Sequence, residues 1–94
     1  MPRYVIERTY DVDEDELPTV ATRSKRIAVE QFPKIVWEHS HVVVDDAGTV
    51  KTFCVYEAPS EEIVRRHARE LGAHEIEGVY IIAGDVTPED FPLS

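Results

Sequence analysis

The order of strand-forming and helix-forming segments is the feature of this sequence that most constrains its fold. Four segments are rich in the β-branched and aromatic residues that favour strands, namely residues 2–10, 35–44, 50–58 and 75–83. Apolar residues recur at helical spacing near residues 16–31 and again over residues 61–71. The order β-α-β-β-α-β predicts an α+β, ferredoxin-like sandwich, in which two helices cover one face of a four-stranded antiparallel sheet.

Short local signals place the ends of these segments. Residues 45–49 read Asp-Asp-Ala-Gly-Thr, a composition typical of turns, so the second and third strands should form an antiparallel hairpin. Ser60 suits the N-cap of the second helix, and Gly72 is expected to end that helix. Pro33 should lie beyond the end of the first helix.

The 94 residues are expected to form a single domain. Its core should span about residues 3–83, and residues 84–94 should form an irregular tail because they include Pro88 and Pro92. Phe91 is the tail residue expected to pack against the domain.

The charge balance excludes some partners. With 19 acidic and 10 basic residues the chain has a formal charge of −9, which disfavours binding to nucleic acid and to anionic membrane surfaces. The sequence has no apolar run near the roughly 20 residues of a membrane span, and its first residues lack the apolar stretch of a signal peptide. A cytoplasmic location is therefore expected.

The predicted second strand is apolar on both of its sides. Val36 and Val42 lie at one parity, and Ile35 and Val43 lie at the other. A strand that is apolar on both sides is expected to be covered on both sides. Because the helices cover only one face of the sheet, we expect a homodimer formed through the other face.

Two histidines on the same predicted strand suggest a metal site. His39 and His41 are two residues apart, so they point to one face of the sheet with Cα atoms roughly 6.6 Å apart. Two imidazoles at that spacing can converge on one ion, and imidazole suits zinc, copper, iron and nickel. The alternative is that both are simply polar side chains on a half-exposed strand.

Further ligands depend on the hairpin register. If Val44 faces Lys51, Cys54 shares the face of the histidines; if Val44 faces Val50, Ser40 faces Cys54 and Glu57 shares that face instead. His67 borders the apolar stripe of the second helix, where a histidine is more often a hydrogen-bonded residue than a ligand.

Catalytic motifs are not found in the sequence. It has no glycine-rich phosphate loop, no cysteine pair at zinc spacing and no nucleophile elbow. Cys54 lies within a predicted strand between two apolar residues, which favours packing over nucleophilic catalysis. An enzymatic role is therefore not the favoured interpretation.

Four features carry a family resemblance: Trp37-x-His39-Ser40, the stretch of residues 51–60, His67 and Gly72. In these features the chain resembles the DUF4242 family, which consists of short bacterial proteins also described as nickel-binding-protein-like. The resemblance runs from about residue 4 to residue 82. It implies a ferredoxin-like fold, dimer formation and membership of a family with a nickel-binding member.

The resemblance also implies which residues can bind metal. His39, Cys54, Glu57 and His67 match metal-capable positions of the family pattern, whereas His41 stands where many relatives have an aromatic or aliphatic residue. The acidic run before the first helix and the proline-containing tail are further departures from the pattern.

The sequence therefore predicts a cytoplasmic, dimeric protein that binds nickel or another divalent transition metal. The predicted ligands are His39, His41, Cys54, Glu57 and His67. One alternative is a dimeric α/β-barrel-like small-molecule binder or enzyme, with a pocket on the sheet face formed by Trp37, His39, Tyr56 and Glu57. A second alternative is a non-catalytic dimerisation module.

Overall fold

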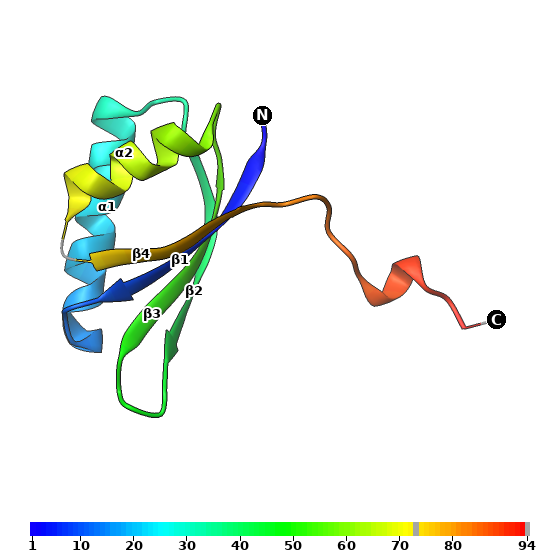
Figure 1. Cartoon of the computed structure of the whole chain (residues 1–94), viewed down its shortest axis with the longest axis horizontal. Helices are drawn as coiled ribbons and strands as arrows, with labels where there is room; N and C mark the ends of the chain where they lie inside the picture. Colours follow the sequence, from blue (N-terminus) through cyan, green and yellow to red (C-terminus); the bar gives the residue numbers. More distant parts are fainter. Residues whose placement is uncertain (73, 94) are drawn as a thin grey trace.

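Six regular elements follow one another in the predicted order. The computed structural model describes residues 1–72 and 74–93 (Figure 1). The elements are β1 (Arg3–Tyr10), α1 (Leu17–Gln31), β2 (Val36–Val44), β3 (Val50–Glu57), α2 (Glu61–Leu71) and β4 (His74–Ile81), with short 3₁₀ turns at Glu14–Glu16 and Pro88–Asp90.

The four strands form one antiparallel sheet in the order β2-β3-β1-β4. Both helices lie on the same side of this sheet (Figure 1). The arrangement confirms the predicted ferredoxin-like fold. The fourth strand ends two residues earlier than predicted, although the N–H of Ile82 still donates to the carbonyl of Arg3 at 2.8 Å.

The predicted caps and turns are confirmed. The hydroxyl of Ser60 accepts a hydrogen bond from the backbone N–H of Ile63 at the start of α2, and Gly72 ends this helix with a φ of 64°. In the hairpin turn, Gly48 has a φ of 83°, and the Asp45 carboxylate accepts hydrogen bonds from two backbone N–H groups of the turn. Pro33 lies beyond the end of α1, as expected.

The core lies between the sheet and the helices. Alternate residues of β1 and β3 point toward the helices and are buried, because successive side chains of a strand face opposite sides. The side chains buried there are mostly apolar, as with Ile6 and Val64, but Arg8 and His67 are buried among them. Among the described residues, no helix has the length and apolar character needed to cross a membrane.

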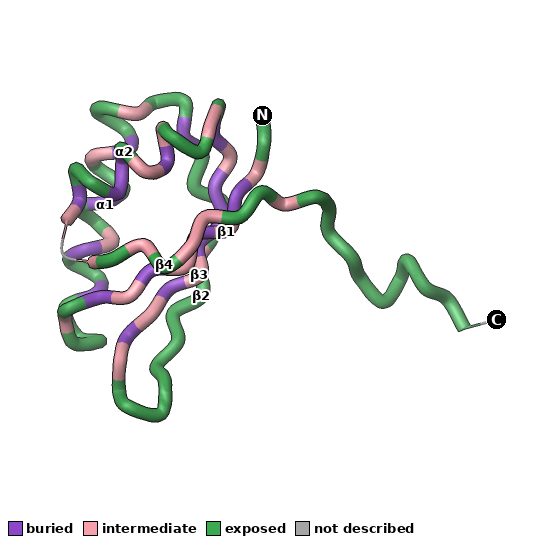
Figure 2. Tube along the Cα trace, viewed as in Figure 1, coloured by how far each residue is buried: buried purple, intermediate pink, exposed green. Residues whose placement is uncertain are grey.

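Strand β2 is the least covered part of the sheet. It lies at an edge and is exposed along nearly its whole length, as Figure 2 shows. Val42 and Val44 belong to the parity that faces the helices, yet each remains about half exposed. The helices therefore pack over β1 and β3 and leave the helix side of β2 partly open.

The C-terminal tail extends away from the domain on the side opposite the helices (Figure 1). The prediction that Phe91 packs against the domain is wrong, since its side chain is 64% exposed. Asp85 holds the root of the tail instead, because its carboxylate accepts a 2.7 Å hydrogen bond from Arg3. An ion pair on the sheet, rather than apolar burial, positions the start of the tail.

His67 is a buried imidazole with defined hydrogen bonding. Its Nε2 atom is 3.0 Å from the carbonyl oxygen of Ser24, so Nε2 carries the hydrogen and donates it. The rings of Phe32 and Tyr56 lie next to it, with centroid separations of 5.9 and 6.1 Å. Burial lowers the pKa of His67 below 6.5, and the hydrogen bond to Ser24 offsets only part of this effect. His67 is therefore neutral at neutral pH.

The buried imidazole makes stability pH-dependent. The pKa of His67 is lower in the folded chain than the value near 6.5 expected when unfolded, so protons bind preferentially to the unfolded chain. The free energy of unfolding should therefore fall as the pH drops below that value. His67→Gln removes this titration and should flatten the pH dependence of the urea midpoint between about pH 7.5 and 5.5. At neutral pH the same variant should lose about 1–3 kcal/mol.

A second histidine supplies the control for this prediction. Burial also lowers the pKa of His74, so His74→Gln should remove a separate part of the pH dependence, and the double variant should be flatter than either single variant. Identical pH profiles for the wild type and His67→Gln would contradict the assignment.

Candidate functional site

The register of the β2–β3 hairpin decides which predicted site residues share a face. Val44 pairs with Val50 and Ser40 pairs with Cys54, which is the second of the two registers considered from the sequence. Before Ser40 in the sequence, β2 contains a one-residue bulge at Glu38. Trp37 therefore lies opposite Tyr56 rather than opposite Glu57.

The two histidines of β2 lie on the face of the sheet that the helices leave uncovered, called the open face below. His39 is opposite Val55 and His41 is opposite Phe53, and both histidines are exposed. Their rings approach edge to face with centroids 5.4 Å apart. The two imidazoles are therefore neighbours on one face of the sheet, and their joint binding of an ion stays a prediction.

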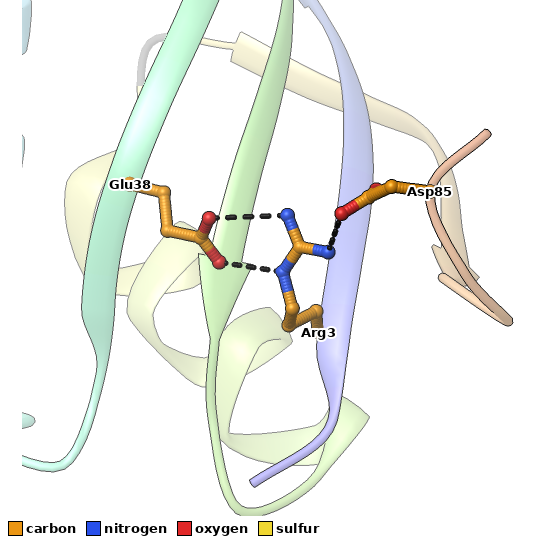
Figure 3. A network of polar contacts seen from close by, with 3 residues as sticks. All are labelled: Arg3, Glu38 and Asp85. Atoms are coloured by element: carbon orange, nitrogen blue, oxygen red, sulfur yellow. Dashed lines mark hydrogen bonds and ion pairs between the residues drawn. The ribbon is translucent and has the colours of Figure 1, made fainter. Parts of the chain in front are cut away.

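Charged side chains lie beside the histidines on the open face. Arg3 donates from Nε and Nη2 to the two carboxylate oxygens of Glu38, at 2.8 and 3.1 Å, and from Nη1 to Asp85 (Figure 3). The hydrogen bonds from Arg3 lower the pKa of Glu38, which stays ionised. Glu57 also belongs to the open face, between Arg3 and Val36 in neighbouring strands.

The other two predicted ligands lie on the helix side of the sheet. Cys54 is buried, and its thiol donates to the hydroxyl of Thr52 at 3.4 Å. His67 is buried against Ser24 as described above. The sheet thus divides the five predicted ligands: His39, His41 and Glu57 on the open face, and Cys54 and His67 in the core.

His39 and His41 are the imidazole donors that the open face offers to a metal ion. Within residues 1–72 and 74–93, no three side chains of His, Cys, Asp or Glu are grouped closely enough to hold one ion. Two imidazole nitrogens suit a nickel, copper or zinc ion that keeps further coordination positions for water or other ligands. They do not form the closed four-ligand site of a structural metal.

The pocket considered as an alternative does not form on the open face. Trp37 and Tyr56 lie on the helix side, where their rings stack with centroids 6.5 Å apart, whereas His39 and Glu57 lie on the open face. The indole N–H of Trp37 donates to the hydroxyl of Ser40 at 2.8 Å, which holds the ring beside α1. These four residues therefore do not line one pocket.

Sequence reasoning missed a cavity on the helix side and the arginine within it. Arg8 has the same parity as Tyr4, Ile6 and Tyr10, so it points into the core with them, and its guanidinium lies 5.3 Å from the centre of the Tyr56 ring. The sequence does contain a sign of this: Arg8 occupies a position in the first strand where the alternation calls for an apolar residue.

Comparisons with known proteins agree with the fold. The model of a family described as nickel responsive protein SCO4226-like matches residues 4–79, while no curated protein matches the sequence. The crystal structure of SCO4226 from Streptomyces coelicolor A3(2) is similar, with a TM-score of 0.65 and 17% identity over 89% of this chain and 99% of that one. The de novo designed protein Foldit4 is similar in fold, with a TM-score of 0.60 and 13% identity over 90% of this chain and 100% of the designed one. Because the family match spans most of the domain, the chain belongs to the SCO4226-like family of nickel-responsive proteins.

Proposed function

We propose that the protein is a cytoplasmic, dimeric metal-binding protein that takes up nickel or a similar divalent ion at His39 and His41. The observation that carries the proposal is the pair of exposed imidazoles with ring centroids 5.4 Å apart on one strand. Membership of a nickel-responsive family favours nickel among the ions that imidazole accepts.

The position of the pair suits reversible binding of an ion. Both imidazoles are exposed, so an ion can reach them without unfolding the core. The net charge of −9 attracts cations to the surface. Water or residues of a second copy would complete the coordination. Copper would bind more tightly than nickel on intrinsic affinity alone, so selectivity would depend on the availability of each metal.

The open face also supports the proposed homodimer. Each of the four strands presents an apolar side chain there that is not fully buried, and these are Val5, Val43, Phe53 and Tyr80. The tail leaves the domain on the same side (Figure 1) and carries the exposed apolar residues Val86, Phe91 and Leu93. A second copy on the open face would cover the sheet and offer a surface for the tail.

Metal titration tests the site. In tag-free, chelator-treated protein we expect saturable heat of nickel binding in calorimetry. His39→Ala and His41→Phe should each weaken the affinity by roughly tenfold or more, because each removes one of two protein ligands.

A matched variant controls for opportunistic binding to histidine. His74→Gln also removes one imidazole, but the His74 Nδ1 is held by the carbonyl of Gly72 at 2.6 Å, so this variant should bind nickel like the wild type. If nickel binding is weak and all three substitutions reduce it equally, nickel binds to separate histidines at the surface and the proposal is wrong.

The dimer is tested separately. In sedimentation equilibrium the wild type should have twice the 10.7 kDa mass of the chain. Phe53→Glu places a charge in the middle of the open face and should give a monomer. Val29→Glu, at a site on α1 that is 66% exposed, should leave the dimer intact. A monomeric wild type would rule out the interface.

A further inference from the structure

Arg8 is a buried cation without an anionic partner among the residues that the structure describes. Its side chain is 1% exposed, and Nε and Nη2 are buried without a hydrogen-bond acceptor among residues 1–72 and 74–93. A guanidinium remains protonated in proteins, so the charge cannot be removed by titration. An unpaired buried charge is costly, and natural cores rarely retain one without a counter-ion.

The neighbouring side chains do not supply that counter-ion. The ion pairs of the described residues involve Arg3, Lys51 and Arg65 but not Arg8. Desolvation raises the pKa of Tyr56 to about 12, so the phenol facing Arg8 is neutral. Tyr56 covers one face of the guanidinium through a cation–π contact, which leaves the in-plane N–H groups for another partner.

The two unpartnered nitrogens form the edge of a guanidinium that binds carboxylates. Nε–H and one N–H of Nη2 point the same way and donate side by side to the two oxygens of a carboxylate. The same edge of Arg3 holds the carboxylate of Glu38 at 2.8 and 3.1 Å (Figure 3). At the surface, this edge of Arg3 holds a carboxylate. In the core, the same edge of Arg8 has no hydrogen-bond acceptor among the described residues.

A cavity and a groove lead to Arg8 from the surface. The cavity has a volume of about 80 Å³ and includes Arg8, Tyr10 and Thr52 among its lining residues. The hydroxyl of Thr52 donates to that of Tyr10 at 3.3 Å, which leaves the Tyr10 O–H available to donate to an anion. The cavity shares Leu17, Ala21, Trp37, Ser40 and Val42 with an open groove of about 440 Å³ between α1 and β2.

We propose that this cavity binds a small organic monocarboxylate. The carboxylate would pair with Nε and Nη2 of Arg8 and accept a hydrogen bond from Tyr10, while an aliphatic or aromatic body would lie along Leu17, Ala21 and Val42. Of the described residues that line the cavity, Arg8 is the only basic one, and the other walls are largely apolar. This lining favours a singly charged, partly apolar ligand over phosphate, which is usually held by several donors at once.

Titration with hexanoate tests the proposal, with hexanamide as the neutral analogue of the same shape. The protein is first treated with chelator, so that an ion at His39 cannot bind the carboxylate. Trp37 is the single tryptophan and lines both cavity and groove, so its fluorescence should report saturable binding of hexanoate. Hexanamide should bind on the order of thirtyfold more weakly, because it lacks the charge that pairs with Arg8.

Three variants assign the binding to Arg8. Arg8→Met should abolish hexanoate binding and keep or raise the melting temperature, because it removes an unpaired buried charge. Arg26→Met, at an exposed position of α1, should bind hexanoate like the wild type. If Arg8→Met does not fold, Ala21→Phe fills the junction of cavity and groove with Arg8 intact and should also lose binding.

Each contrary outcome overturns the proposal. Equal affinities for hexanoate and hexanamide would mean an apolar groove without a role for Arg8. Competition by chloride or phosphate at lower concentration than hexanoate would mean an inorganic anion site. No saturable change in fluorescence or heat would mean that Arg8 is solvated by water alone.

Discussion

The bulge at Glu38 is the local feature on which both faces of β2 depend. Without it, Trp37 and His39 would have the same parity and would point to one face of the sheet. The extra residue turns Trp37 toward the helices, where it stacks on Tyr56, and leaves both histidines on the open face. Two polar contacts hold this arrangement: the fork of Arg3 on Glu38, and the hydrogen bond from Trp37 to Ser40. Arg3 also holds Asp85, so one guanidinium ties together the bulge, the first strand and the root of the tail.

The sheet separates side chains that suit a cation from side chains that suit an anion. On the open face, exposed imidazoles and carboxylates provide the donors that suit a cation. On the helix side, the buried guanidinium of Arg8 and the hydroxyl groups near it would suit an anion. A chain with a net charge of −9 would be expected to attract cations rather than anions. The proposed anion site is an exception because the arginine that would bind the anion is buried. Arg8 is shielded from solvent, so its field is weakly screened within the core although the surface is acidic.

The fold could be predicted because each of its signals is local. Helical spacing, strand propensity, the Ser60 cap and the stop at Gly72 act within a few residues, and all agree.

The division of the site residues could not be predicted, because a bulge changes register without a clear signature in composition. Cys54 and His67 fit a metal-capable pattern in sequence, yet the register and the helix packing place them in the core. Phe91 is predicted to pack against the domain, but its side chain stays exposed because the ion pair between Arg3 and Asp85, rather than an apolar contact, sets where the tail leaves the sheet. The burial of Arg8 could have been predicted from its position, because it alternates with the apolar residues of the first strand that point into the core. A strand assigned from β-propensity alone gives no information on which face a single charged residue takes.

The incomplete cover over the helix side of β2 gives the proposed carboxylate site its access. The helices pack over the central strands, so the helix side of β2 borders a groove instead of being sealed in the core. An ion at His39 and a carboxylate beside Trp37 would then contact opposite faces of the same segment of strand, on either side of the bulge. Trp37 and His39 flank Glu38, so both proposed sites depend on the same bulge. Thermodynamic linkage would make any coupling between the two sites reciprocal: if the ion changes the affinity for the carboxylate, the carboxylate changes the affinity for the ion by the same factor. The Arg3–Glu38 ion pair is the contact that holds the bulge, and with it the placement of Trp37 and His39 on opposite faces of the sheet.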